Sequence, residues 1–147
     1  MTTIHRTILV EYSAKEMYDL VNDIEKYPDF LPLCQAVEVH MHTETKGEVT
    51  LKIAKGGVKI DFGTYNDMIP NQEIKIRLIK GPFKRLLGVW HFIHLNDKAC
   101  KVTLDLEFEF SSKLLALLLG VVFNTLANTM LDSFCKRAKT VYGVTVA

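Results

Sequence analysis

Apolar and polar residues alternate strictly along Val102–Phe110, and this segment runs directly into the apolar segment Leu114–Phe123. The period of two predicts a half-buried strand, and the apolar segment begins a helix that we expect to continue to about Tyr142. The first half of this helix is apolar all round, whereas the second half has one apolar stripe opposite a polar one. A helix that is apolar all round needs more apolar cover than one sheet face provides. The pattern therefore points towards binding of a lipid-like ligand, a membrane or another macromolecule.

The N-terminal part of the chain reads as one strand followed by a helical region. Thr3–Glu11 has strand character. Ser13 and Glu16 have the spacing of a capping box, and an apolar stripe at helical spacing follows them. We expect this helix to end near Asp23–Glu25. Residues 27–34 contain two prolines, which forbid a long helix and predict a short helical turn. This turn is either a plain connector or a gate over an apolar pocket.

Period-two segments dominate the rest of the chain and predict further strands. These segments are Val37–Thr43, Glu48–Ala54, Val58–Ile69, Glu73–Lys80, Val89–Leu95 and Val102–Phe110. The basic and apolar segment Phe83–Gly88 is predicted to be a loop. Strands and helices do not alternate, so we expect an α+β fold of the helix-grip kind. In this fold a curved antiparallel sheet of about six or seven strands wraps around the long C-terminal helix, with two short helices after the first strand.

Composition narrows the class of protein. The 147 residues suit a single domain, 1–147, and with 48% hydrophobic residues the chain can build a sizeable core. A formal net charge of +1 does not indicate a nucleic-acid protein, so any electrostatic partner needs a local patch. The three cysteines are far apart and form no C-x-x-C pair, which favours free thiols in the cytoplasm. We read no secretion signal, and the apolar run is about half the length of a membrane span.

Four segments carry a resemblance to a known family. They are Tyr18–Cys34, Gly81–Leu86, the Gly88-x-Trp90-x-Phe92 motif and Phe134–Gly143. With them the chain resembles the START-like (helix-grip) superfamily over nearly its whole length. Within the superfamily it is most similar to the branch of coenzyme Q-binding proteins and the ribosome association toxin RatA, which older descriptions call polyketide cyclase-like. Leu33 stands where many relatives carry a tryptophan. The expected pocket mouth therefore has one aromatic group fewer in this chain.

The resemblance implies two activities, neither of them enzymatic. One is binding of ubiquinone or a similar isoprenoid lipid in a cavity between the sheet and the C-terminal helix, in support of respiration. This is our main interpretation, and it requires no cofactor apart from the bound lipid. The alternative is a toxin-type regulator that binds the large ribosomal subunit and blocks subunit association. The implied location is the cytoplasm with peripheral contact to the inner membrane surface, and DNA is not an expected partner.

The residues expected to line the cavity come from the segment Tyr27–Cys34, which would form a lid, from the inward positions of the strands and from the C-terminal helix. They are Phe30, Leu31, Leu33, Leu51, Ile53, Phe62, Leu78, Trp90, Phe92, Leu104, Leu106, Leu119, Phe123, Leu126 and Met130. A quinone head group would also need a hydrogen-bond donor, for which the sequence offers Tyr12, Thr64, Tyr65, Trp90 and His94 without ranking them. The inward strand residues belong to the core whether or not they touch a ligand.

A basic ridge is the candidate surface for a partner. Arg77 alternates with the apolar positions of its strand, and Lys80, Lys84 and Arg85 lie just beyond. Lipid headgroups and ribosomal RNA are the anionic partners that such a ridge would suit. The opposing interpretation is an ordinary solvated surface whose basic residues pair with the acidic positions of a neighbouring strand.

Catalysis and metal binding have little support in the sequence. His40 and His42 are two residues apart on one strand, but no third ligand is placed by spacing. Cys34 follows the lid without an obvious base, which favours a packed thiol over a nucleophile. A cyclase would need a buried acid or base, whereas the assigned inward positions are nearly all apolar. We therefore expect neither a catalytic residue nor a metal site.

Overall fold

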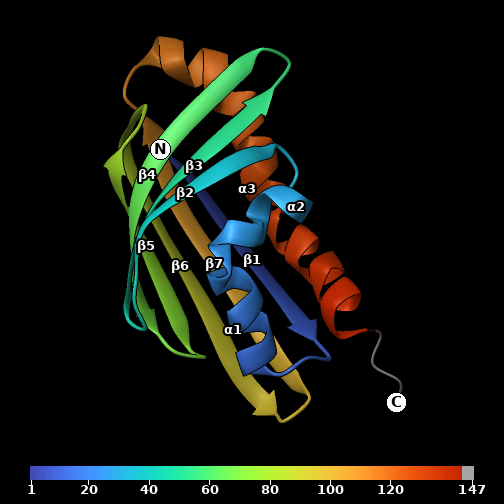
Figure 1. Ribbon diagram of the computed structural model, residues 1–147. Coiled ribbons are helices and arrows are strands. Elements are labelled where there is room, and N and C mark those ends of the chain that lie inside the picture. Colours follow the sequence, from blue (N-terminus) through green and yellow to red (C-terminus); the bar gives the residue numbers. More distant parts are fainter. Residues whose placement is uncertain (144–147) are drawn as a thin grey trace.

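The structure is a computed structural model, and residues 1–143 are described. Seven strands form one antiparallel sheet in the order β1-β7-β6-β5-β4-β3-β2, and the long helix α3 crosses its concave face (Figure 1). This confirms the predicted helix-grip fold class. The elements are β1 (Thr2–Val10), α1 (Ala14–Asn22), the 3-10 helix η1 (Ile24–Lys26), α2 (Tyr27–Phe30), β2 (Cys34–His42), β3 (Lys46–Lys55), β4 (Val58–Ile69), β5 (Glu73–Lys80), β6 (Phe83–Asn96), β7 (Ala99–Phe110) and α3 (Lys113–Tyr142).

The start of α1 has the capping box predicted from the sequence. The backbone N–H of Glu16 donates to Ser13 Oγ at 3.1 Å, and the backbone N–H of Ser13 donates to Glu16 Oε1 at 2.9 Å. Two of the donors that a helix leaves free at its N-terminus are thereby satisfied. The apolar stripe of α1 is buried through Met17 and Val21, so the helix is held at one end of the sheet.

The lid is built from η1 and α2. Pro28 lies in the first turn of α2, where a missing backbone N–H costs no hydrogen bond. The helix ends at Phe30 with Leu31 as its C-cap, and Leu33 then adopts a positive φ of 71°, which redirects the chain into β2. The rings of Tyr27 and Phe30 both contact Phe134 of α3, so the lid packs directly on the long helix.

The segment Phe83–Gly88 is the start of β6, and the prediction of a loop there was wrong. Phe83 pairs with Phe110 and Leu86 pairs with Phe108, with an irregularity in register between Phe83 and Arg85. This irregularity breaks the period of two and lets both Phe83 and Leu86 point into the core. The actual turn between β5 and β6 is Gly81-Pro82, where Gly81 has a φ of 144°.

Helix α3 divides into two unlike halves. From Val122 onward the helix contributes Phe123, Leu126 and Phe134 to the core, each at most 3% exposed. The first half leaves Leu117 and Val121 at 78% and 77% exposed. By length and composition α3 would be able to cross a bilayer, and 28% of its most apolar window is buried inside the protein. Among the described residues, α3 therefore contributes fully to the core from Val122 onward, with Leu119 packed at the edge of the core.

An added methyl group is expected to have opposite effects on stability at Gly81 and at Gly120. Gly81→Ala would place a Cβ 2.7 Å from Cβ of Phe62 at a backbone conformation that L-residues rarely adopt. We expect it to lower the free energy of unfolding by more than about 1 kcal/mol. Gly120→Ala, inside α3, meets nothing within 4 Å and is expected to raise it by up to about 1 kcal/mol. Denaturant titration measures both, and an unchanged or more stable Gly81→Ala would contradict the assigned turn.

Candidate functional site

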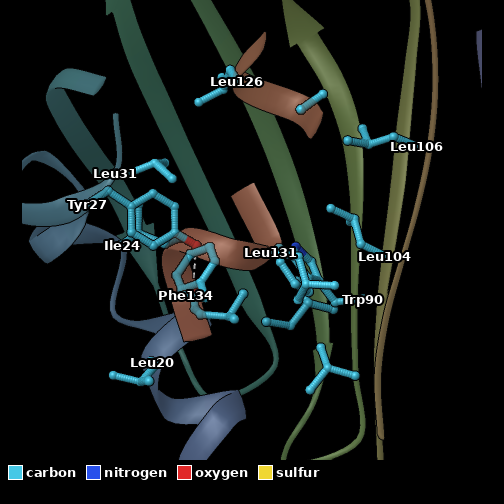
Figure 2. Close-up of a cluster of buried hydrophobic side chains, with 14 of the residues drawn as sticks. Leu20, Ile24, Tyr27, Leu31, Trp90, Leu104, Leu106, Leu126, Leu131 and Phe134 are labelled. Atoms are coloured by element: carbon cyan, nitrogen blue, oxygen red, sulfur yellow. Dashed lines mark hydrogen bonds between the residues drawn. The ribbon is translucent and has the colours of Figure 1, made fainter. Parts of the chain in front are cut away.

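A small apolar cavity lies between the concave face of the sheet and α3. Its volume is about 70 Å³. Residues of β3 to β7, η1, α2 and α3 line it: Ile24, Tyr27, Val49, Leu51, Phe62, Thr64, Asn66, Ile76, Leu86, Trp90, Leu104, Leu106, Phe123, Leu126, Ala127 and Met130. Figure 2 shows Tyr27 and Phe134 side by side in this region, with Trp90 facing them from the sheet. Ligand pockets usually measure about 300–1,000 Å³, so in this conformation the space is mostly core.

The structure brings about half of the predicted cavity residues together. Those that line the cavity are Leu51, Phe62, Trp90, Leu104, Leu106, Phe123, Leu126 and Met130. The others lie outside it: Phe30, Leu31, Leu33, Ile53, Leu78, Phe92 and Leu119. Phe92 packs edge-on against Tyr18 of α1, and Phe30 packs between Phe134 and the guanidinium of Arg137. The prediction identified the inward faces of the strands, but it could not give the position of each inward residue relative to the cavity.

Several lining residues are absent from the predicted cavity list, although Thr64 was named as a candidate head-group donor. Thr64 and Asn66 continue the inward parity of Ile60 and Phe62 along β4, although their side chains are polar. Leu86 was omitted because its segment was predicted to be a loop. Tyr27 belongs to the lid, where no period indicates which side chain points inward.

Asn66 joins the apolar cavity to a polar pocket beside it. Thr64 Oγ1 donates to Asn66 Oδ1 at 3.1 Å, and both side chains are buried. Asn66 also lines the second pocket, of about 180 Å³, together with Asn22, Asp23 and His42. His42 Nε2 lies 3.3 Å from Asn22 Oδ1 across this pocket. The arrangement offers polar contacts at one end of an apolar space.

The other candidate head-group donors have different positions. Trp90 lines the cavity with Thr64. Tyr12 donates its hydroxyl to the carbonyl of Gly143 at 2.6 Å, and Tyr65 lies under the guanidinium of Arg77, 5.0 Å from its ring centre. His94 is exposed. Thr64 and Trp90 are therefore the two sequence candidates that border the cavity.

The cavity has little capacity for proton transfer. Tyr27 is the ionisable side chain that lines it among the described residues. The Tyr27 hydroxyl donates to the carbonyl of Val21, and burial raises the pKa of this phenol above its ordinary value. At neutral pH the phenol therefore stays protonated and already uses its proton in a hydrogen bond. A general acid or base needs a pKa near the working pH, which this group lacks.

The cysteine and histidine candidates have structural surroundings. Burial raises the pKa of both Cys34 and Cys100 to about 11, so at neutral pH both thiols are protonated and poor nucleophiles. His40 Nε2 contacts Thr50 Oγ1 at 2.8 Å, whereas His42 turns towards Asn22 after a register irregularity between Val39 and Met41. Within residues 1–143 no group of three histidine, cysteine or carboxylate side chains could hold a metal ion.

The basic ridge is neutralised in part. Arg77 lies 4.0 Å from Asp67, and Arg85 lies 3.3 Å from Glu107 on the neighbouring strand. Lys80 and Lys84 are exposed at the turn between β5 and β6 and form no ion pair with a described carboxylate. The structure thus divides the four predicted partner residues into two cross-strand pairs on the sheet and two lysines without an ion pair within 4.0 Å of a described carboxylate, of which Lys80 still interacts with Glu38 through its charge.

Comparison with known families decides the relationship. The family described as "Polyketide cyclase / dehydrase and lipid transport" matches residues 10–135. The chain belongs to this family. It is 45% identical over 142 residues to the ribosome association toxin RatA of Pseudomonas aeruginosa, covering 97% of this chain and 99% of the relative. The RatA of Escherichia coli K12 is 43% identical, with 97% of this chain and 90% of the relative covered.

More distant relatives share the fold. The mitochondrial coenzyme Q-binding protein COQ10 homolog B of Xenopus laevis is 29% identical over 90% of this chain and 56% of its own length. A START superfamily protein from Mycobacterium smegmatis superimposes with a TM-score of 0.79 at 16% identity, over 95% of this chain and 98% of its own. The Zhui aromatase/cyclase gives a TM-score of 0.77 at 17% identity, over 94% and 93% of the two chains. The predicted resemblance to the START-like superfamily and its RatA branch is confirmed.

The two buried thiols predict a loss of stability at alkaline pH. Above pH 9.0 the thiols of the unfolded chain ionise, while in the folded chain their pKa of about 11 keeps them protonated. The unfolded state then binds fewer protons, so the free energy of unfolding falls as the pH rises from 9.0 through about 11. Denaturant titrations at a series of pH values measure this slope. The slope should be shallower for Cys34→Ala with Cys100→Ala, and an identical slope would contradict the assignment.

Proposed function

We propose that this chain is a ribosome-binding regulator of the toxin type, which contacts the large ribosomal subunit and opposes subunit association. The observation that carries the proposal is the similarity to proteins named ribosome association toxin, at 45% identity over 97% of the chain. Likeness over the full fold favours a shared partner more strongly than a shared cavity would. The proposal replaces ubiquinone binding as the first interpretation.

The surface chemistry is compatible with a ribosomal partner. Ribosomal RNA presents phosphates, which attract clustered lysine and arginine side chains. Lys80 and Lys84 are exposed and form no ion pair within 4.0 Å of a described carboxylate, and Arg85 is about half exposed beside its pair with Glu107. We propose the basic ridge, Arg77, Lys80, Lys84 and Arg85, as the contact surface.

We also propose that the chain acts without catalysis. A cavity whose polar lining consists of a threonine, an asparagine, a tryptophan and a hydrogen-bonded phenol has no group suited to acid–base work. The aromatase/cyclase among the structural neighbours is 17% identical and shares the fold alone. Binding, rather than bond-making, is the activity that these side chains favour.

Charge reversal on the ridge tests the ribosome proposal. We expect Lys84→Glu with Arg85→Glu to weaken co-sedimentation with isolated large subunits, because two phosphate contacts become repulsive. The slope of log affinity against log salt concentration should fall by about two. Co-sedimentation through a sucrose cushion over a salt series measures both quantities.

The matched control reverses two lysines at the opposite end of the sheet. Lys98 lies in the turn between β6 and β7 and Lys101 lies in β7, so Lys98→Glu with Lys101→Glu makes the same change in net charge. This control should keep the wild-type affinity and salt slope. Equal weakening of both variants would assign the effect to net charge and contradict the proposed surface. A wild-type protein that never co-sediments at low salt would contradict ribosome binding altogether.

A second candidate function is binding of a lipid with a polar head, such as an isoprenoid quinone. The observation that favours it is the junction at Asn66, where the apolar cavity meets the polar pocket with Asn22 and His42. Burial of an isoprenoid tail contributes about 0.8 kcal/mol per methylene. At about 70 Å³ the cavity must widen to admit such a tail, and the lid on α3 is the proposed moving part.

Extraction of the purified protein, kept free of detergent, tests the lipid proposal. We expect co-purifying lipid in the organic extract of the wild type, detected by mass spectrometry, and none from Leu106→Glu, which puts a carboxylate into the cavity wall. Ala127→Leu fills the cavity without a charge and should also reduce the yield. The control Ile93→Glu alters an apolar residue that is 44% exposed outside the cavity. An empty wild-type extract, or equal yields from folded variants, would contradict lipid binding.

A further inference from the structure

An exposed apolar stripe covers the first half of α3. Leu117 and Leu118 each lie three or four residues from both Leu114 and Val121, and the four residues, in chain order, are 64%, 78%, 57% and 77% exposed. Residues at these intervals lie on one face of a helix. Soluble monomeric proteins rarely expose a contiguous apolar patch without a partner for it.

The stripe is separate from the core contacts of α3. Leu119 packs against the core from the opposite side of the helix, and Phe123 continues that inward side into the cluster with Phe83 and Phe110. The outward stripe ends where Thr125 and Asn128 replace the apolar residues. The change from apolar to polar on one helix face marks the boundary of the patch.

The charges around the stripe are basic. Helix α3 begins at Lys113 and has no acidic residue in its first turn, although a helix N-terminus favours acidic side chains. Lys113 and Lys84 border one hollow with Ala116, in which Glu109 is the carboxylate. Lys80 lies at the adjacent turn. None of these lysines forms an ion pair within 4.0 Å among the described residues.

Two further lysines lie at the same end of the molecule. The turn between β3 and β4 carries exposed Lys55 and Lys59. In Figure 1 this turn and the orange start of α3 both lie at the top of the view. The ring of Phe62 in β4 contacts Phe123 of α3, so the two elements are packed together below this end. The turn between β3 and β4 therefore brings two exposed lysines to the end of the molecule at which α3 begins.

We propose that this end of the molecule docks onto the surface of an anionic lipid bilayer. The leucines and the valine would enter the boundary between headgroups and acyl chains, and the lysines would meet the lipid phosphates. An amphipathic surface with apolar residues bordered by lysines binds anionic interfaces in this way, to a depth of about 5–10 Å. The inference does not depend on the proposed ribosome binding.

A second copy of the chain suits the surface less well than a bilayer does. In a two-fold symmetric dimer the same patch meets itself. The lysines that border the stripe would then meet those of the partner, and the first acidic residue of α3 is Asp132, several turns from the stripe. A bilayer presents a dense layer of phosphates to these lysines, whereas a second copy would present the carboxylate of Glu109 beside its own lysines.

Vesicle flotation of the full chain tests the proposal. The probe is vesicles of equimolar phosphatidylglycerol and phosphatidylcholine, compared with vesicles of phosphatidylcholine alone. We expect the wild type to float with the anionic vesicles and to bind the neutral ones more weakly. Leu117→Glu with Val121→Glu should lower the partition coefficient about tenfold or more, because two inserting groups become charged. Lys113→Glu should lower binding to the anionic vesicles alone.

The control is Leu9→Glu, which changes a residue of β1 that is 68% exposed and lies away from α3. Leu9→Glu and the double variant Leu117→Glu with Val121→Glu alter exposed side chains, and both should keep the wild-type circular dichroism spectrum and thermal midpoint. Equal flotation of the wild type and the α3 variant would overturn the proposal. So would a wild type that ignores anionic vesicles, including one that sediments as a dimer which Leu117→Glu with Val121→Glu dissociates.

Discussion

The packing of Phe134 is the contact on which the rest of the structure depends. This residue of α3 is fully buried, and its ring centre lies 5.3 Å from Tyr27, 5.2 Å from Phe30 and 5.4 Å from Trp90. One side chain thereby joins the helix, the lid and the concave face of the sheet. Aromatic pairs at such distances contribute about 0.5–1.5 kcal/mol each beyond the area that they bury. Any opening of the lid must break at least two of these contacts, which keeps the apolar cavity small.

Because the cavity is small and closed, the exposed groups of the protein are the more favourable candidates for binding a partner. The cavity is lined by apolar groups and a few neutral polar ones, and the hydroxyl of Tyr27 donates a hydrogen bond to the carbonyl of Val21. The surface carries the exposed lysines Lys80 and Lys84 and the exposed first half of α3. These features lie on neighbouring elements, because the turn between β5 and β6 is bonded to Ser111, just before α3. One end of the fold thus carries both the basic and the apolar surface.

The sequence predicted the fold class because each element has a local signal. The capping box at Ser13 and the alternation in Val58–Ile69 each specify their element without help from the rest of the chain. The prediction was wrong at Phe83–Gly88, where a register irregularity hides the strand period. For the cavity, the sequence predicts only which face of each strand points inward. The alternation places Leu104 and Leu106 inward, but it does not show that Phe92 lies beyond the cavity under α1. Cross-strand pairing of the basic residues, which the sequence offered as the opposing interpretation of the ridge, is present at Arg77 and Arg85, but alternation alone did not identify the acidic partner of each.

Lysine footprinting on the ribosome tests the central claim that the end of the fold around the basic ridge is the contact surface. The full chain is acylated alone and with a saturating excess of large ribosomal subunits, and the modification of each lysine is measured by mass spectrometry. The account predicts that Lys80 and Lys84 become protected, while Lys98 and Lys136 react as they do in the free protein. Unchanged reactivity at Lys80 and Lys84 in a sample that is fully bound would contradict it.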